Sequence, residues 1–278
     1  MAWKQWLEDL RRRLIVEPIN SDRRSRQGAP LGKTADWVFQ HGIGGGQADF
    51  DQPIDNLSPR DRAMLYALFN QKSHIDELIH AFELFLPSLQ LVEGTTVVDI
   101  GCGPFTSGLA LANVVGAVAS FRYFGIDRAS SMRSLGKEFA DGVRRASEFH
   151  ERTCVNFHND LTAVNFGTSR AAERTLFVLS YLLASDSIDP ATLVNDIDSA
   201  AKRIGWGPTY VLYTNSAVSY NRRHFPEFQT IMEAAGFRLD QPAEVADFED
   251  FRGRKRSIHY ALFIRTGRNS VPIGEFEV

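Results

Sequence analysis

The sequence predicts an α/β protein built on a doubly wound, mostly parallel β-sheet. An apolar strand, 97–100, runs into a Gly-x-Gly turn, and an apolar helix rich in Ala and Leu, 105–119, follows it. Further strand patterns recur along the rest of the chain, as expected for parallel βαβ units. With 278 residues, of which 44% are hydrophobic, the chain can bury one large core and carry an appended segment.

The turn after the first predicted strand carries the strongest functional signal. It has the sequence Asp-Ile-Gly-Cys-Gly over residues 99–103. Glycines at such a turn let the backbone and the amides of a helix N-terminus approach a ligand. Asp99 would repel the pyrophosphate of a dinucleotide, and Thr106 stands where the third glycine of Gly-x-Gly-x-x-Gly is required. The turn therefore suits a cationic ligand without phosphate and disfavours an NAD-dependent oxidoreductase.

This turn resembles the cofactor loop of the class I S-adenosylmethionine-dependent methyltransferases, and the resemblance covers residues 90–268. It implies a seven-stranded, Rossmann-like sheet, mostly parallel with an antiparallel last strand and with helices on both faces. It also implies a methyltransferase that binds S-adenosyl-L-methionine (AdoMet) and releases S-adenosyl-L-homocysteine (AdoHcy). The loop residues that it assigns to the cofactor are Asp99, Gly101, Cys102 and Gly103.

The second predicted strand, 120–127, is rich in aromatic and β-branched residues and ends in an acid. Ligands of doubly wound sheets lie outside the carboxyl ends of the strands. We therefore expect Asp127 to accept hydrogen bonds from both ribose hydroxyls, with Arg128 beside it at the cofactor. The alternative is that Asp127 caps a helix that begins near Ser130 and Ser131.

The third predicted strand, 153–158, is followed by Asn159, Asp160 and Leu161. The resemblance implies that an acid or amide at this place meets the exocyclic amine of adenine, and that the Leu161 backbone amide serves the ring. All three residues are thereby assigned to the cofactor. The alternative is a turn, because Asn-Asp pairs are common turn formers.

The uninterrupted apolar run 175–181 predicts a central strand that is buried on both faces. In the family that the chain resembles, the end of this strand delivers residues to the methyl group. Ser180 is thereby expected at the cofactor and Tyr181 in the active-site wall. Core packing is the alternative for both.

The last third of the chain predicts a fifth strand at 209–214, a helix at 228–235 that Gly236 ends, and a strand that starts at 237–239. A final strand, 257–264, follows. A helix, then Ala-Ala-Gly-Phe, then two successive strands resembles the end of the methyltransferase sheet.

The sequence pattern of the N-terminal part differs from that of the rest of the chain. We therefore predict two domains: a helical cap, 1–90, and a methyltransferase domain, 91–278. An amphipathic helix at 2–16 is followed by a loop rich in Gly, Pro, Arg and Asp at 17–56. The glycine cluster 42–46 within it could cradle an anion or hinge a lid, and the alternative is that it is merely flexible.

Two further helices are predicted in this part, at 59–71 and 74–86. Ser58 supplies an N-cap signal for the first of them, and Pro87 is expected to end the second. The resemblance implies that such a cap lies over the cofactor cleft and selects the acceptor.

Methyl transfer is an in-line displacement, in which alignment and exclusion of water contribute roughly 7–11 kcal/mol. A general base is required only for a protonated, weakly acidic acceptor, and histidine is the usual base near neutral pH. His74 on the predicted cap and His224 after the fifth strand are the candidates that can face the cleft. With Tyr181 they are the candidate catalytic residues, and a structural role is the alternative for each.

The sequence lacks motifs that mark two other methyltransferase classes, and this restricts the class of methyl acceptor. The segment 180–183 is Ser-Tyr-Leu-Leu, not the Asn/Asp-Pro-Pro-Tyr/Phe of exocyclic-amine methyltransferases, and no cysteine stands where a cytosine-C5 nucleophile is expected. We therefore expect transfer to an oxygen or nitrogen of a small molecule. Arginine clusters leave an RNA methyltransferase as the alternative; they lie at residues 11–13, 22–26, 222–223 and 252–256. A non-catalytic alternative is a cofactor-binding scaffold.

Composition excludes several other classes. The net charge of −3 gives no general attraction to nucleic acid. The two cysteines make neither a disulfide framework nor a zinc site, and no spaced acids suggest another metal site. No apolar run is long enough to cross a bilayer, and the N-terminus lacks the apolar core of a signal peptide. We expect a cytoplasmic protein without a membrane partner.

Overall fold

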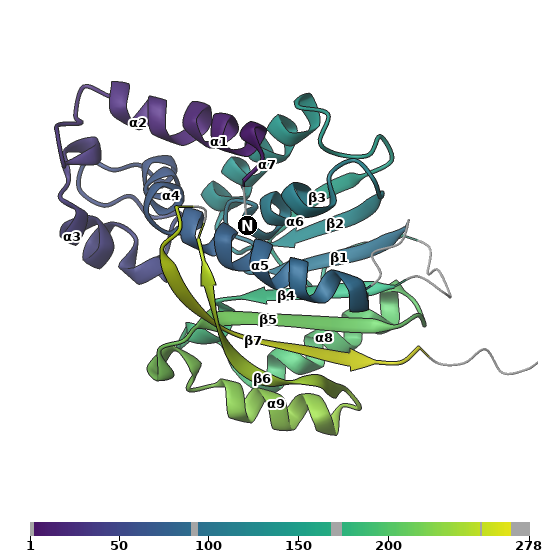
Figure 1. Ribbon diagram of the computed structural model, residues 1–278. Coiled ribbons are helices and arrows are strands. Elements are labelled where there is room, and N and C mark those ends of the chain that lie inside the picture. The colour runs from purple at the N-terminus through teal and green to yellow at the C-terminus, as the bar shows by residue number, and fades with distance from the viewer. Residues whose placement is uncertain (1–2, 90–93, 168–173, 251, 268–278) are drawn as a thin grey trace, which may run out of the picture.

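The computed structural model describes residues 3–89, 94–167, 174–250 and 252–267. These residues form a seven-stranded sheet with the order β3-β2-β1-β4-β5-β7-β6 (Figure 1). Its strands are β1 (Thr95–Ile100), β2 (Phe121–Ile126), β3 (Cys154–His158), β4 (Thr175–Ser180), β5 (Thr209–Ser216), β6 (Arg238–Glu249) and β7 (Lys255–Arg265). The first five strands pair in parallel, and β7 runs antiparallel to both β5 and β6. The predicted sheet with an antiparallel last strand is confirmed.

Helices cover both faces of this sheet. The α-helices are α1 (Gln5–Arg11), α2 (Glu17–Ser21), α3 (Ala35–Trp37), α4 (Pro59–Tyr66), α5 (Lys72–Leu89), α6 (Thr106–Val115), α7 (Ser130–Arg145), α8 (Pro190–Ile204) and α9 (Phe225–Ala234). Short π- and 3-10 turns are η1 (Arg12–Val16), η2 (Pro30–Gly32), η3 (Val38–Gly42), η4 (Gly44–Gly46), η5 (Ala67–Gln71), η6 (Leu182–Ala184) and η7 (Ser219–Arg222). The N-terminal helices, α5, α6 and α7 pack on one face, and α8 and α9 pack on the other.

The central strands contribute alternate residues to the two cores. In β4, Leu176 and Val178 belong to the core under α5, α6 and α7, whereas Phe177 and Leu179 belong to the core under α8 and α9. Because side chains of a strand alternate between faces, an apolar run without polar residues is buried on both sides. This confirms the interpretation of 175–181 as a central strand.

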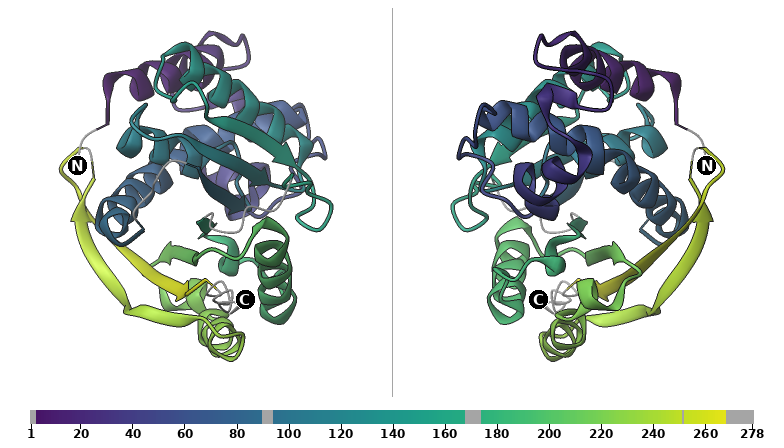
Figure 2. Two further views of the ribbon diagram at one scale, coloured as in Figure 1. Left: turned by 90° about the vertical axis from the view of Figure 1, so that its right-hand side faces the viewer. Right: turned by 90° about the vertical axis from the view of Figure 1, so that its left-hand side faces the viewer.

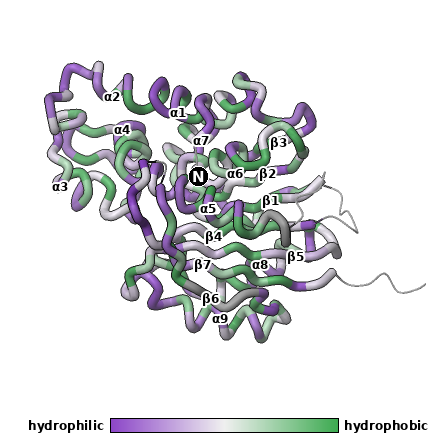
Figure 3. Tube along the Cα trace, viewed as in Figure 1, coloured by the Kyte–Doolittle hydropathy of each residue, from purple (hydrophilic) through white to green (hydrophobic). Residues whose placement is uncertain are grey.

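The β6–β7 hairpin is longer than the sequence pattern predicts, and it curls around α5 (Figure 2). The Phe248 ring stacks on His80 of α5 with centroids 4.9 Å apart. Arg256 of β7 lies 3.4 Å from the Glu77 carboxylate of the same helix. The turn at the tip of the hairpin is hydrophilic, unlike the central strands (Figure 3). Contacts with α5, rather than a local pattern, extend these strands.

Three predicted boundaries in the N-terminal part are wrong. The first helix does not end at residue 16, because η1 joins α1 to α2, and Pro18 lies directly after this π turn. The helices α4 and α5 form one run through η5, and that run passes Pro87 to end at Leu89. The predicted Ser58 cap is confirmed, with Pro59 in the first turn. The predicted domain boundary between residues 90 and 91 lies outside the described residues.

The predicted loop 17–56 contains short helical turns and is held by tertiary hydrogen bonds. The buried Arg62 guanidinium of α4 donates to the backbone oxygens of Gly42, Asp49 and Gln52. A guanidinium offers five donors in a fixed geometry, so one side chain can fix several carbonyls of an irregular segment. Such contacts leave no periodicity in the sequence, which is why the segment looked structureless.

Asp51 of this segment caps a helix of the sheet domain. Its carboxylate accepts hydrogen bonds from the backbone amides of Ser130 (2.7 Å) and Ser131 (2.9 Å), the first residues of α7. A carboxylate at a helix N-terminus satisfies amides that have no partner within the helix. The segment is thereby tied to α7 across the chain.

We expect Asp51→Ala to lower the free energy of unfolding by about 1 kcal/mol, because the first amides of α7 lose their cap. Urea denaturation followed by circular dichroism measures it. Asp36→Ala is the matched control, because Asp36 is an exposed carboxylate of the same segment, and it should change stability by less than about 0.5 kcal/mol. Equal effects of both substitutions would show that the cap contributes nothing.

Candidate cofactor and active site

A cavity of about 280 Å³ lies at the carboxyl ends of β1, β2 and β4. Six residues that the sequence predicted for the site line it together: Gly101, Gly103, Asp127, Arg128, Ser180 and Tyr181. The N-terminal segment also lines it, with Gly46, Gln47, Ala48, Phe50 and Tyr66. These N-terminal residues were not predicted for the site.

The loop after β1 has the geometry that its glycines suggest. Gly101 and Gly103 have φ values of 74° and 51°, in the left-handed region that favours glycine. A Cβ atom at Gly101 would lie 3.0 Å from a methyl group of Leu182. The backbone amides of Gly101 and Cys102 both donate to the Ile126 carbonyl, at 2.8 and 3.0 Å. The loop therefore folds back over the end of β2 and presents its backbone to the cavity.

Asp127 joins the glycine loop to the start of α7. One carboxylate oxygen accepts the Gly103 amide and the other accepts the Ala129 amide, each at 2.9 Å. Burial raises the pKa of Asp127, against the effect of these hydrogen bonds. A carboxylate has about four acceptor positions, so both oxygens keep capacity for a ligand in the cavity. Asp127 binds the amide of Ala129, the N-cap residue of α7, whereas the amides of Ser130 and Ser131 donate to Asp51, so Asp127 does not cap the helix in the predicted way. The ribose contact stays a prediction.

Asp99 lies beneath the glycine loop and is only 1% exposed. The Tyr123 hydroxyl donates to its Oδ2 at 2.5 Å, and burial raises the pKa of Asp99 to about 7. Neither Asp99 nor the buried Cys102 is among the residues that line the cavity. The structure thus places the carboxylate behind the loop, and its predicted interaction with the cofactor would act through charge.

Besides Asp99 and Cys102, five predicted site residues do not line the cavity: His74, Asn159, Asp160, Leu161 and His224. Asn159 and Asp160 are exposed, and the Asp160 carboxylate accepts both the amide and the hydroxyl of Thr162 at 2.8 Å, which is the predicted turn alternative. Leu161 is part of the core under α8 and α9. His224 is the N-cap residue of α9. Their cofactor and catalytic roles stay predictions.

His74 and Tyr181 lie together, as their assignment to one site requires. Their rings stack with centroids 4.0 Å apart, and the Tyr66 hydroxyl is 3.4 Å from His74 Nδ1. Burial, with a smaller effect of the Arg256 charge, lowers the pKa of His74 to about 4, so the imidazole is neutral at pH 7. Tyr181 has a φ of 60°, a strained value for a non-glycine residue that is common at functional sites.

The sequence did not reveal Glu77, which stands behind Tyr181. Its carboxylate is 3% exposed and lies 3.4 Å from the Arg256 guanidinium. Burial raises the pKa of Glu77 to about 7, and interactions with Tyr181 and Arg256 oppose this rise. Helix α5 and the hairpin strand β7 bring these residues together from distant parts of the chain. No local sequence pattern predicts that Glu77 and Arg256 form such a pair.

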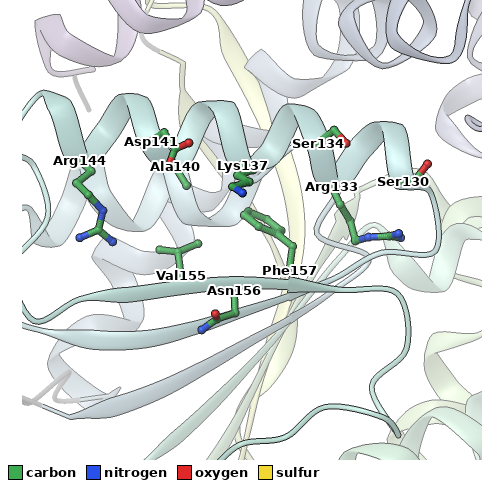
Figure 4. A pocket seen from close by; sticks show the side chains of 10 residues that line it. All are labelled: Ser130, Arg133, Ser134, Lys137, Ala140, Asp141, Arg144, Val155, Asn156 and Phe157. Atoms are coloured by element: carbon green, nitrogen blue, oxygen red, sulfur yellow. The ribbon is translucent and has the colours of Figure 1, made fainter.

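A second cavity, of about 380 Å³, lies between α7 and the edge strand β3 (Figure 4). Its cations are Arg133, Lys137 and Arg144. Both arginines already donate to backbone carbonyls, Arg133 at the end of β2 and Arg144 to Thr153 at 3.0 Å. This cavity shares no lining residue with the first one and contains none of the predicted site residues. The cavity at the glycine loop is therefore the candidate site.

Two absences among the described residues bear on the site. No three His, Cys, Asp or Glu side chains there gather in a way that could hold a metal ion. Within the same residues, no helix combines the length and apolar character that a membrane crossing requires.

No family model matches the sequence, and no curated protein matches it. Among solved structures, a candidate class I S-adenosylmethionine-dependent methyltransferase from Listeria monocytogenes aligns with 98% of this chain and 91% of its own, at 9% identity and a TM-score of 0.52. An S-adenosylmethionine-dependent methyltransferase from Methanosarcina mazei aligns with 65% of this chain and 97% of its own, at 17% identity and a TM-score of 0.43. Fibrillarin from Aeropyrum pernix, solved with natively bound AdoMet, aligns with 69% of this chain and 76% of its own, at 13% identity and a TM-score of 0.42.

The match to the Listeria structure extends over nearly the whole chain. The seven strands, parallel except for β7, agree with the sheet that the glycine loop implied. The chain therefore has the fold of the class I S-adenosylmethionine-dependent methyltransferases.

Proposed function

We propose that the chain is an enzyme that transfers a methyl group from AdoMet to an oxygen or nitrogen of a small molecule. The observation that supports this most is the cavity that joins the glycine loop, Asp127 and the end of β4 in one wall. Doubly wound sheets bind their ligands outside the carboxyl ends of the strands where the strand order reverses, which is here between β1 and β4. A cytoplasmic location is part of the proposal.

The cavity wall suits the parts of AdoMet. Asp127 keeps acceptor capacity for the ribose hydroxyls, and apolar residues around it, such as Met132 and Ile188, suit a purine ring. The glycine loop lets the backbone approach the amino-acid part closely, since a side chain at Gly101 would meet Leu182. When bound, AdoMet would supply an electrophilic methyl group.

The chain's own residues would align the acceptor and exclude water. Gln47 bridges the N-terminal segment to η6 by donating to the Ala184 carbonyl at 3.1 Å, and the segment lines the cavity. His74 does not line the cavity but stacks on Tyr181, which does, so the neutral imidazole can position the Tyr181 ring, and its low pKa makes it a weak base. Glu77, whose pKa is about 7, is the nearby group best matched to hold a proton at neutral pH.

Arginines that are paired within the chain support the proposal of a small acceptor rather than RNA. Most arginines of the four sequence clusters are engaged within the chain: Arg11 with the Ala67 carbonyl, Arg12 with Asp9 and Glu17, Arg24 with Asp22 and Asp61, Arg26 with the Arg23 carbonyl, Arg223 with Asp186, Arg254 with Asp250, and Arg256 with Glu77. Paired arginines offer less charge to a phosphate backbone than free ones. If RNA is the acceptor, binding of RNA should weaken steeply as the salt concentration rises. A measurement of this salt dependence distinguishes an RNA acceptor from a small-molecule acceptor.

Isothermal titration tests the cofactor. We expect the folded protein to bind both AdoMet and AdoHcy and not to bind NADH. Folded protein that binds neither AdoMet nor AdoHcy would contradict the proposal. Transfer of labelled methyl groups to pooled small hydroxyl and amine compounds, compared with transfer to RNA, then distinguishes the enzyme from its alternatives. Cofactor binding without transfer to either pool would favour a scaffold.

A further inference from the structure

Tyr66 connects the two glycine segments that the sequence analysis singled out. A Cβ atom added at Gly103 of the cofactor loop would lie 3.7 Å from Cε1 of this ring. A Cβ atom added at Gly46 of the N-terminal cluster would lie 3.4 Å from Cε2. The two glycines therefore approach opposite edges of one ring. Gly46 has a φ of 97°, so the close approach and the backbone conformation both favour glycine there.

The Tyr66 ring belongs to an aromatic group at the wall of the candidate site. Phe50 packs against it edge to face, with centroids 5.6 Å apart, and His74 lies 6.3 Å away. His74 in turn stacks on Tyr181. Phe50, Tyr66 and Tyr181 all line the cavity. The phenol stays neutral, because burial raises the pKa of Tyr66, as do nearby carboxylates to a lesser extent.

A sulfonium ion presents a particular problem of recognition. It carries a positive charge but has no N–H or O–H, so it cannot be held by ordinary hydrogen bonds. Its charge can be stabilised by lone pairs or by the negative face of an aromatic ring. The charged residues in the cavity wall are Asp127 and Arg128. If Asp127 serves the ribose, the aromatic group is a feature of the wall that can attract the sulfonium, in addition to the Asp99 charge behind the glycine loop and the neutral oxygens of the wall.

We propose that Tyr66 recognises the positive charge of the AdoMet sulfonium, so that the N-terminal segment helps to distinguish AdoMet from the uncharged thioether of AdoHcy. This inference rests on the proposed function and extends it to a residue outside the glycine loop. It also gives the glycine cluster a role, because Gly46 lets the segment close against the ring. Loss of the charge after methyl transfer would weaken this contact and favour release of AdoHcy.

The test compares the affinities for AdoMet and AdoHcy in Tyr66→Leu, Tyr66→Phe and wild-type protein by isothermal titration. We expect Tyr66→Leu to bind AdoMet about tenfold more weakly and AdoHcy less than threefold more weakly. Tyr66→Phe keeps the ring and should keep the wild-type ratio within about twofold. Phe69→Leu is the matched control, because Phe69 is exposed on the same helical run and does not line the cavity. It should leave both affinities unchanged.

The outcomes separate this inference from the proposed function. If the wild type binds both ligands and Tyr66→Leu weakens them equally or not at all, Tyr66 does not sense the charge, while the proposed function stands. If the folded wild type binds neither ligand, both proposals are wrong. Should Tyr66→Leu fail to fold, Tyr66→Gln provides the same comparison with a side chain that lacks a π face but keeps a polar end.

Discussion

Replacing Asp127 by alanine is expected to lower the affinity for AdoMet by a factor of about 100 or more. The proposed ribose contact comprises two hydrogen bonds to a carboxylate, and hydrogen bonds to charged groups contribute about 1.5–3 kcal/mol each. The substitution also removes the acceptor of the Gly103 amide and therefore loosens the glycine loop. Isothermal titration measures the affinity, and circular dichroism verifies that the variant is folded.

Asp186→Ala is the matched control for this prediction. Asp186 is a carboxylate near the same cavity, but its side chain is 77% exposed and pairs with Arg223 outside the wall. We expect it to change the affinity by less than about twofold. If Asp127→Ala also leaves the affinity within twofold of the wild type, Asp127 serves only to hold the Gly103 and Ala129 amides and does not contact the ribose.

Replacing Asp99 by asparagine is expected to make the protein progressively more stable than the wild type as the pH rises. Burial raises the pKa of Asp99 from 3.8 to about 7. Between pH 3.8 and pH 7 the Asp99 carboxyl is ionised in the unfolded chain but protonated in the folded one. Rising pH therefore favours the unfolded state and lowers the free energy of unfolding of the wild type. Below pH 3.8 the carboxyl is protonated in both states and this effect vanishes. Asparagine does not titrate, so the difference grows by about 1.4 kcal/mol for each pH unit of the window.

Urea denaturation of both proteins at pH 5 and pH 8 measures this difference. The titrations of His74 and Glu77 occur in both proteins and cancel in the comparison. Asp189→Asn is the control: Asp189 is exposed, and hydrogen bonds from Thr192 lower its pKa. That variant should gain no stability relative to the wild type as the pH rises. A constant difference between Asp99→Asn and the wild type would show that Asp99 is ionised freely in the fold.

The same variant tests whether the Asp99 charge contributes to binding of a cation. At pH 8 the wild-type carboxylate is ionised, and we expect Asp99→Asn to bind AdoMet about threefold to tenfold more weakly. At pH 5 the wild-type side chain is largely neutral as well, and the two affinities should agree. Comparison of the two proteins at one pH cancels the titration of the ligand itself. Equal affinities at pH 8 would exclude electrostatic recognition by this residue.

The wall residues that the sequence predicted all lie next to strand ends, and this is why they could be predicted. Gly101, Gly103, Asp127, Ser180 and Tyr181 each follow or end a strand with a clear apolar pattern. Parallel strands bring their carboxyl ends to one edge of the sheet, so residues distant in the chain meet there by topology alone. Asp160 and His224 were also predicted for the site but do not line the cavity, because the direction of a side chain after a strand depends on its turn.

The N-terminal half of the cavity wall could not be predicted in this way. Tyr66 lies at the end of α4, one turn after Arg62. Gln47 and Phe50 reach the cavity because Arg62 fixes the backbone of the segment and Asp51 fixes it to α7. These contacts join side chains to backbone atoms across irregular structure. They follow no period in the sequence.

By itself the sequence determined the order of the strands and helices, the burial of the central strands, and the backbone conformation of the glycine loop. Each of these follows from local properties: apolar periodicity, the restricted backbone of most residues, and the freedom of glycine. Only the tertiary structure decided that Asp99 lies behind the loop, that Glu77 meets Arg256, and that Tyr66 stands between two glycine segments. Burial and the approach of distant residues are properties of the packed chain, and they set the charges and contacts of the site.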